Sequence, residues 1–171
     1  MKFWTIQHID FWNMNKEKEY LEAHPNYIFK EFSDSYLWMM NQMSQRLENY
    51  KGNYPIWLWL KRPDLRCSGH FNKGEHGVLL EVELNQEEVL ISDCMAWHVV
   101  LNDGFLAFTE EEDCLFERGL LSMTKEESWN RIFDYKELNK YEYWKREEDL
   151  QAVIERIKMT KVRLVKEFKA K

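Results

Sequence analysis

Apolar residues at helical spacing, with capping residues before them, predict a series of helices. The clearest run extends from Tyr36 to Tyr50, is capped by Ser33 or Asp34 and ends before Gly52. A side-chain oxygen at such a cap accepts a hydrogen bond from a free amide of the first turn. The same signals predict further helices from Asp10 to about His24, after Ser92 or Asp93, and after two capping boxes, Thr109 with Glu112 and Thr124 with Glu127.

Alternating apolar residues predict strands between these helices. In residues 54–60 both alternating sets are apolar, so this strand is expected at the centre of a sheet. Residues 78–84 carry Glu81 and Glu83 on one side, which indicates a solvent-exposed face. Residues 89–91 are expected to be their partner strand, and residues 3–7 a short first strand.

The C-terminal segment 150–168 fits two alternatives. Its apolar residues suit one helix face with a gap at Lys161, or a strand to about Ile157 followed by a helix from Thr160. Strands and helices intermixed along the chain predict an α+β fold. We therefore expect a single compact domain over residues 1–171, with a mixed or antiparallel central sheet and helices around it.

The composition supports this expectation and reduces the classes of binding partner to consider. A chain of 171 residues can bury roughly 70% of its unfolded surface, enough for a full core. The net charge of −6 argues against general nucleic-acid binding, because such binding depends on neutralising phosphates. The longest apolar runs are far shorter than the ~20 residues that cross a bilayer, so no membrane partner is expected. An odd number of cysteines, three, and no signal-peptide core predict a cytoplasmic location.

The loop 61–70 carries the densest set of candidate ligand-binding groups. Arg62 and Arg66 offer forked donors to a phosphate or carboxylate, and His70 ends the loop. The alternative is a solvent-exposed loop in which an arginine pairs with Asp64. The residue types alone leave both interpretations open.

No metal is expected from the sequence. Cys67, His70, His76 and His98 have the chemistry of zinc ligands, but their spacing matches no standard pattern. Cys67 also lacks the flanking signature of a thiol enzyme. The common phosphate-loop, dehydrogenase, hydrolase and zinc-protease motifs do not occur in the sequence.

The junction at residues 92–98 is a second candidate region, where a strand ends and a helix begins. Asp93 is expected to cap the helix, and Trp97 and His98 are candidates to line a pocket. Trp57 and Trp97 are both candidates for an aromatic wall against a flat ligand. The alternative is that these side chains cap a helix and fill the core.

Several segments together resemble an uncharacterised family of small bacterial proteins, known as a domain of unknown function. The segments that carry this resemblance are 3–7, 54–57, 62–66, His70, 77–81, 89–102, 128–133 and 151–168. The resemblance covers nearly the whole chain and implies no established activity.

The order of the predicted elements is also similar to the ADP-ribosyltransferase-like fold. In that fold a first-strand His or Arg and a late Glu hold NAD and stabilise the cation that forms as nicotinamide leaves. Here the first strand offers Thr5 and Gln7, and the late position is Gln151 or, less well, Glu155. The resemblance implies NAD as the cofactor, with Arg66 as a donor to its pyrophosphate.

We therefore expect a protein that binds a nucleotide-like ligand, NAD or ADP-ribose. The candidate catalytic residues are Thr5, His98 and Gln151, and the candidate ligand-binding residues are Arg62, Arg66, His70, Trp57, Asp93 and Trp97. The alternative from a different class is a non-catalytic module that binds a protein or a nucleic acid. The sequence does not decide whether the chain is an enzyme.

Overall fold

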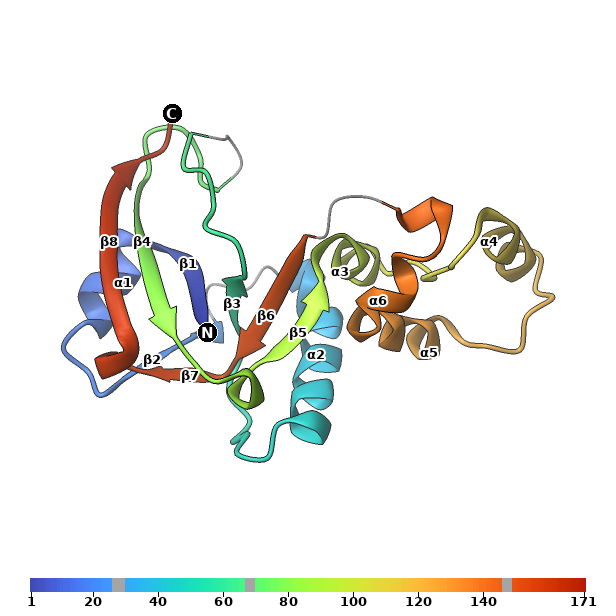
Figure 1. The fold of residues 1–171 in the computed structure, drawn as a ribbon, viewed down its shortest axis with the longest axis horizontal. Helices are drawn as coiled ribbons and strands as arrows, with labels where there is room; N and C mark the ends of the chain where they lie inside the picture. The colour runs from blue at the N-terminus through green and yellow to red at the C-terminus, as the bar shows by residue number, and fades with distance from the viewer. Residues whose placement is uncertain (26–29, 67–69, 146–148) are drawn as a thin grey trace.

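A six-stranded antiparallel sheet organises the computed structural model, which describes residues 1–25, 30–66, 70–145 and 149–171 (Figure 1). Its strand order is β5-β6-β3-β1-β4-β8, and β2 and β7 form a separate two-stranded sheet. The strands are β1 (Lys2–His8), β2 (Tyr20–Glu22), β3 (Ile56–Trp59), β4 (His76–Glu83), β5 (Leu90–Asp93), β6 (Leu150–Ile154), β7 (Arg156–Lys158) and β8 (Val162–Lys169). The predicted α+β class and antiparallel sheet are confirmed.

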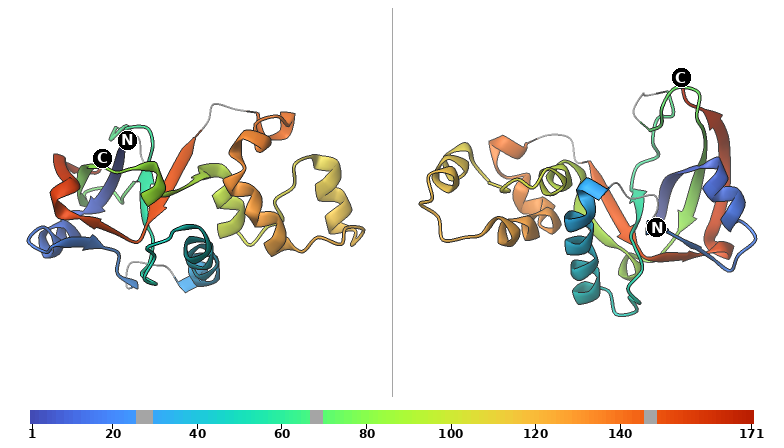
Figure 2. Two further views of the ribbon diagram at one scale, coloured as in Figure 1. Left: turned by 60° about the horizontal axis from the view of Figure 1, so that its bottom comes forward. Right: turned by 180° about the vertical axis from the view of Figure 1, so that it is seen from behind.

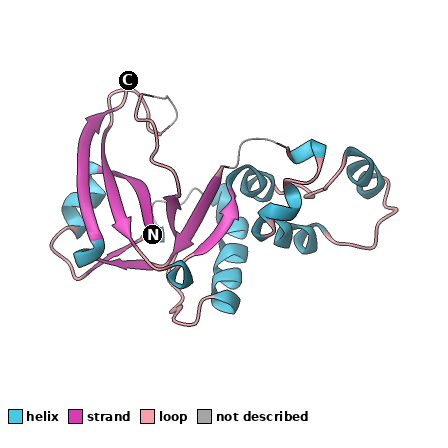
Figure 3. Cartoon of the chain, viewed as in Figure 1, coloured by secondary structure: helices cyan, strands magenta, loops and turns pink. Residues whose placement is uncertain are grey.

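Helices lie beside the sheet and extend from its β5 edge (Figure 3). They are α1 (Ile9–Asn15), α2 (Ser33–Arg46), α3 (Cys94–Leu101), α4 (Glu110–Glu117), α5 (Lys125–Trp129) and α6 (Tyr135–Leu138). Short 3-10 turns occur at Lys30–Phe32, Gln86–Glu88, Asn130–Phe133, Glu142–Trp144 and Met159–Lys161. Helix α4 lies farthest from the sheet, at the end of the region that runs from α3 to α6 (Figure 2).

The two faces of the sheet are covered by two separate hydrophobic clusters. Phe3, Leu58 and Ala152 belong to one cluster, which also contains Phe11 and Trp12 of α1. We call the side of the sheet that carries these residues the Phe3 face. Side chains of directly paired residues point to the same face, and neighbours along a strand point to opposite faces. The opposite side, which carries Trp57, Trp59 and Val153, is the Trp59 face, and α2 and α3 pack against its Trp57 end.

The capping residues in the sequence correctly predicted where α4 and α5 begin. Thr124 accepts from the amide of Glu127, whose side chain accepts in turn from the Thr124 amide, which completes the predicted capping box of α5. Thr109 caps α4 by accepting from the Glu112 amide at 3.1 Å. The Glu112 side chain does not return to Thr109, because it accepts from the Phe108 amide and pairs with Arg131.

The first two helices differ from the prediction. Helix α1 begins after His8, whose Nδ1 accepts from the Asp10 amide, so Asp10 is not the cap. It ends at Asn15 and not near His24, because Leu21 is buried in the strand β2, which pairs with β7. Helix α2 begins at Ser33 after an N-cap residue, Phe32, that makes no side-chain cap bond. It ends at Arg46 where Leu47 turns extended.

Strand pairing also corrects the sequence interpretation. The residues around Ile91 do not pair with β4: the turn at Gln86–Glu88 redirects the chain, and β5 pairs with β6 instead. The expected strand near 150–157 exists as β6 and β7, but the helix expected from Thr160 is strand β8, which pairs with β4 along its length. The solvent-exposed face expected for β4 is only partial, because Leu79 is fully buried there. Pairing between distant segments decided each of these outcomes, and local periodicity does not report it.

Replacing Gln42 by methionine is expected to raise the free energy of unfolding by about 1 kcal/mol, because a buried unsatisfied acceptor is costly. Gln42 is 4% exposed in α2. Among the buried side-chain nitrogen and oxygen atoms of the described residues, only its Oε1 has no hydrogen-bond partner. Urea unfolding followed by circular dichroism measures the change. Gln45→Met, at an exposed position of the same helix, is the matched control and should shift stability by less than about 0.5 kcal/mol. A loss of stability in Gln42→Met would contradict the assignment of an unsatisfied acceptor.

Candidate functional site

One row of side chains crosses all six strands on the Trp59 face. The strand registers pair Ser92 with Gln151, Gln151 with Trp59, and Trp59 with Trp4. Trp4 in turn pairs with Glu81, and Glu81 with Arg163. We call these six residues the tryptophan row. It brings together β5, β6, β3, β1, β4 and β8, so its members come from both ends and the middle of the chain (Figure 1).

The middle of the tryptophan row combines partly exposed aromatic rings with a buried amide. Trp4 and Trp59 are half-buried, whereas Gln151 is 7% exposed and its Nε2 lies 3.5 Å from the Ser92 hydroxyl. The imidazole of His70 meets the ring of Trp59 edge-on at 5.9 Å between centroids. Indole faces stack on flat heterocycles, and a side-chain amide both donates and accepts hydrogen bonds. The arrangement therefore suits a flat polar ligand.

A close backbone contact holds the segment that carries His70 against the sheet. Phe71 stacks on Phe168 at 6.1 Å and contacts His8 edge-on at 5.8 Å. A Cβ atom at Gly77 would collide with Phe71 and would lie 2.8 Å from Cζ of Phe168. The missing side chain of Gly77 thus lets Phe71 lie directly on β4, which fixes the residue after His70.

The β8 end of the row is an ion-pair network. Glu81 lies 3.3 Å from the Lys2 ammonium and 2.9 Å from the Arg163 guanidinium. Hydrogen bonds from Arg163, and then from Lys2, lower the pKa of Glu81 against the opposing effect of its desolvation. Arg163 is largely exposed, so this end of the row presents positive charge to solvent.

Thr5 and Gln151, two of the predicted catalytic residues, are not brought together. Thr5 pairs with Leu80 and is 1% exposed, which places it on the Phe3 face. Its hydroxyl accepts a hydrogen bond from Gln7 at 2.7 Å. Gln151 lies on the opposite face, which also carries Trp57, and His70 contacts the ring of Trp59, the partner of Gln151.

Trp57 and Trp97 do come together, but inside an aromatic cluster with Tyr36. Their ring centroids are 4.7 Å apart, and each ring lies 6.0 Å from that of Tyr36. The Trp57 indole donates to the Tyr36 hydroxyl at 3.1 Å, and burial raises the pKa of Tyr36. Trp97 is only 4% exposed. The contacts are those of core packing between α2, α3 and β3.

Asp93 and His98 make local contacts around α3. Asp93 caps the helix as expected, accepting from the Ala96 amide at 2.8 Å. His98 is exposed, with Nδ1 2.8 Å from the Cys94 carbonyl oxygen. Neither side chain belongs to the tryptophan row.

In the described part of the loop 61–70, an arginine pairs with Asp64, which is the alternative that the sequence left open. Arg66 binds Asp64 through Nε and Nη2, the latter at 2.7 Å, and hydrogen bonds from its side chain and amide lower the pKa of Asp64 to about 2. Arg62 is exposed. His70 reaches back to the Asp64 carbonyl oxygen at 3.3 Å. Cys67 lies outside the described residues.

Sequence reasoning missed Trp4 and Trp59. The signal was present in part, since Trp57 and Trp59 mark one face of β3 and Trp4 alternates with Phe3 and Thr5. Only the register, Trp4 with Trp59 and Trp59 with Gln151, reveals that the three side chains form one row.

Comparison with known proteins identifies one family. The sequence matches the family described as "Domain of unknown function (DUF3841)" over residues 2–126. No curated protein and no solved structure matches the chain. Among the described residues no helix is long and apolar enough to cross a bilayer, and no three His, Cys, Asp or Glu side chains are grouped to hold a metal ion.

Proposed function

The chain belongs to the DUF3841 family, and we propose that it binds a nucleotide-like ligand, NAD or ADP-ribose, on the tryptophan row. The row itself carries the proposal: it aligns Gln151, the late position in the resemblance to the ADP-ribosyltransferase-like fold, with Trp59 and Trp4. The indole faces would stack on the adenine or nicotinamide ring. Arg163 and Lys2, at the β8 end, would face the phosphates.

The neutral side chain of Gln151 favours binding over rapid transfer. A carboxylate at this position would stabilise the cation that develops as nicotinamide leaves, and a neutral amide does so less well. His70, which the sequence predicted for the site, lies with its imidazole edge-on to the Trp59 ring. We propose a ligand-binding domain with, at most, slow turnover of NAD.

NAD or ADP-ribose, at a hundredfold excess over its dissociation constant, is expected to stabilise the fold by about 2.7 kcal/mol. For a chain of this length the melting temperature should rise by about 5–10 °C. Trp59→Ala should remove most of the shift, because stacking on an aromatic ring is worth about 1–3 kcal/mol per base. Differential scanning fluorimetry, referred to each variant's own ligand-free melting temperature, measures both effects.

Trp38→Ala is the matched control for Trp59→Ala. Trp38 is also half-buried, but it stacks on Phe133 and contacts Trp129 edge-on in the helical region. Its variant should keep the full ligand-induced shift. Melting curves that do not respond to NAD, ADP-ribose or mononucleotides would overturn the proposal in favour of a non-catalytic binding module. A full shift in Trp59→Ala would remove the ligand from the tryptophan row.

A further inference from the structure

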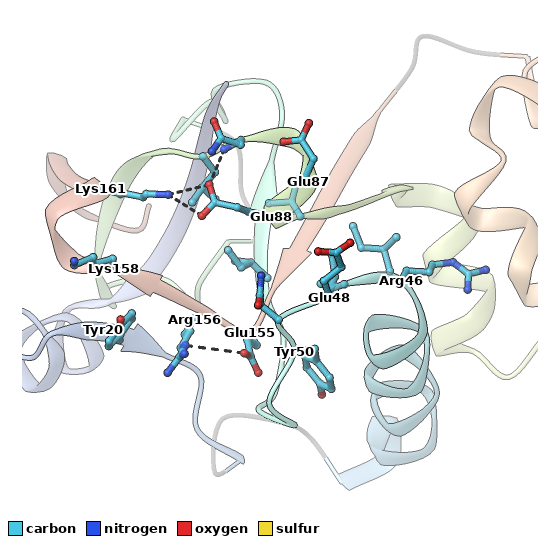
Figure 4. A pocket seen from close by; sticks show the side chains of 17 residues that line it. Tyr20, Arg46, Glu48, Tyr50, Glu87, Glu88, Glu155, Arg156, Lys158 and Lys161 are labelled. Atoms are coloured by element: carbon cyan, nitrogen blue, oxygen red, sulfur yellow. Dashed lines mark hydrogen bonds and ion pairs between the residues drawn. The ribbon is translucent and has the colours of Figure 1, made fainter.

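A cavity of about 700 Å³ lies away from the tryptophan row, below the turn between β4 and β5 (Figure 4). It is lined by the end of α2 and the following loop, by the β4–β5 turn, and by the segment that joins β6, β7 and β8. Tyr20 of β2 closes one side and Tyr50 the other. Small-molecule sites typically have volumes of about 300–1,000 Å³, so a compact ligand fits.

Partly buried hydrogen bonds fix the Tyr50 side of this cavity. The carboxylate of Glu155, a 6%-exposed residue, accepts from the Lys51 amide at 2.7 Å and from the Asn53 amide at 3.4 Å. The Tyr50 hydroxyl donates to the Asn53 carbonyl at 2.8 Å. Burial, followed by the negative charge of Glu155, raises the pKa of Tyr50 to about 12, so this hydroxyl remains a donor at neutral pH.

The opposite side of the cavity is fixed by the two-stranded sheet. Tyr20 pairs with Lys158 in the β2–β7 register, and the Arg156 guanidinium lies over the Tyr20 ring at 4.6 Å. Arg156 approaches Glu155 only at 4.0 Å. This side therefore holds two cations beside an aromatic ring, and only one of them is near a carboxylate.

Charges that have no partner among the described residues lie on separate sides of the cavity. The side chain of Lys158, an exposed residue on the Tyr20 side, makes no ion pair or hydrogen bond with a described residue, whereas Lys161 is bound to Glu88 at 2.7 Å. Glu48 and Glu87 likewise have no such partner, and Figure 4 places them away from Lys158, toward the α2 end. The cavity thus has a positive side and a negative side, and its lining also includes the apolar side chains of Leu47, Val89 and Ile154. Arg46 lies beside Glu48, but its guanidinium donates to Asn130 and lies over the Phe133 ring at 4.6 Å.

We propose that this cavity binds a short peptide with free ends, its carboxylate toward Lys158 and Arg156 and its ammonium toward Glu48 and Glu87. A ligand with a single charge would leave the charges on the opposite side of the cavity without a counter-charge. A zwitterion with an apolar body matches both charged sides and the apolar lining. Forked and point-charge cations bind a carboxylate through charge-assisted hydrogen bonds. The site is independent of the nucleotide proposal, since no member of the tryptophan row lines it.

Isothermal titration calorimetry with trialanine, N-acetyl-trialanine and trialanine amide tests this proposal. Trialanine should bind the wild-type protein at least tenfold more tightly than either blocked peptide. Lys158→Ala should abolish the preference for the free carboxylate over the amide. The double variant Glu48→Gln, Glu87→Gln should abolish the preference for the free amine over the acetylated peptide.

Two controls complete the experiment. Lys166→Ala, at an exposed position of β8 outside the cavity, should keep both preferences, and Trp59→Ala should keep peptide binding whether or not it loses NAD. Absence of binding by trialanine at millimolar concentration would overturn the proposal. So would equal affinity for all three peptides in the wild-type protein, or a carboxylate preference that persists in Lys158→Ala.

Discussion

Trp97→Ala is expected to lower the free energy of unfolding by about 4 kcal/mol, the middle of the range for removing a large buried aromatic ring. Trp97 is 4% exposed and packs at 4.7 Å from Trp57 and 6.0 Å from Tyr36. These contacts join α3 to α2 and to the centre of the sheet, so the cavity left by the ring would weaken all three elements. Urea unfolding measures the loss, and the slope of the unfolding free energy against urea concentration should be the same in the variant and the wild-type protein.

Two further substitutions separate core packing from a ligand wall. Trp97→Phe keeps most of the volume and should cost less than about 1.5 kcal/mol. Tyr143→Ala removes a ring that is 59% exposed and should change stability by less than about 0.5 kcal/mol. If Trp97→Ala cost less than about 1 kcal/mol, the ring would line a solvent-filled space. The sequence-based hypothesis of an aromatic wall for a ligand would then regain support.

The parts of the fold that could be predicted from sequence are those that local patterns determine. The run from Tyr36 onward specified α2, and the capping oxygens of Thr109 and Thr124 located α4 and α5. The alternation in 54–60 indicated a central strand, and β3 does lie between β6 and β1. Each of these signals depends on residues close in sequence, and for that reason the structure confirms the predictions made from them.

The parts that could not be predicted depend on pairing between distant residues. Residues 162–169 have a pattern that suits a helix, but in the structure they form a long antiparallel pair with β4. A helix at this position would leave that edge of β4 unpaired. Strand β5 pairs with β6, almost sixty residues later, and not with its neighbour β4. Backbone amides and carbonyls must be satisfied, and the tertiary arrangement decides which partner does so.

Strand register also decides which of the predicted site residues lie together. Gln151 was selected through a resemblance, and the register places it beside two tryptophans that the sequence did not single out. Thr5 was selected because it lies on the first strand. However, Phe3, Trp4, Thr5 and Ile6 give this strand no clearly polar face, so its orientation could not be read from the pattern. A one-residue difference along a strand moves a side chain to the other face of the sheet.

A partly buried ion pair joins α4 to the turn that follows α5. Arg131 donates to Glu112 through Nη1 at 2.8 Å and Nη2 at 2.7 Å, and to the Leu106 carbonyl at 2.7 Å. Its guanidinium also lies over the Phe108 ring at 4.1 Å. The Arg131 and Glu112 side chains are 13% and 23% exposed. No residue of α4 itself is buried, so this pair and the stacking of Phe116 on Phe105 at 4.0 Å attach the helix to the neighbouring segments.

Arg131→Met is therefore expected to lower the free energy of unfolding at pH 7 by about 3 kcal/mol, since it leaves a partly buried carboxylate without its cation. Lys140→Met is the matched control. The pair of Lys140 with Glu137 is exposed and should contribute less than about 1 kcal/mol. Chemical unfolding of both variants beside the wild-type protein measures the difference. Equal losses in the two variants would contradict a special role for the Arg131–Glu112 pair.

The effect of Arg131→Met should also depend on pH. Desolvation alone would raise the pKa of Glu112, but hydrogen bonds from Arg131 and the Phe108 amide, with the attraction of the Arg131 charge, lower it overall. A folded-state pKa below that of the unfolded chain, about 4.3 for Glu, gives stability that is fully present above pH 4.3. That stability is lost as the pH falls through the lower, folded-state value. The gap in unfolding free energy between wild type and Arg131→Met should thus be smaller at pH 3 than at pH 7. A gap of the same size at pH 3 and pH 7 would mean that the packing of Arg131 on Phe108, and not its charge, attaches α4.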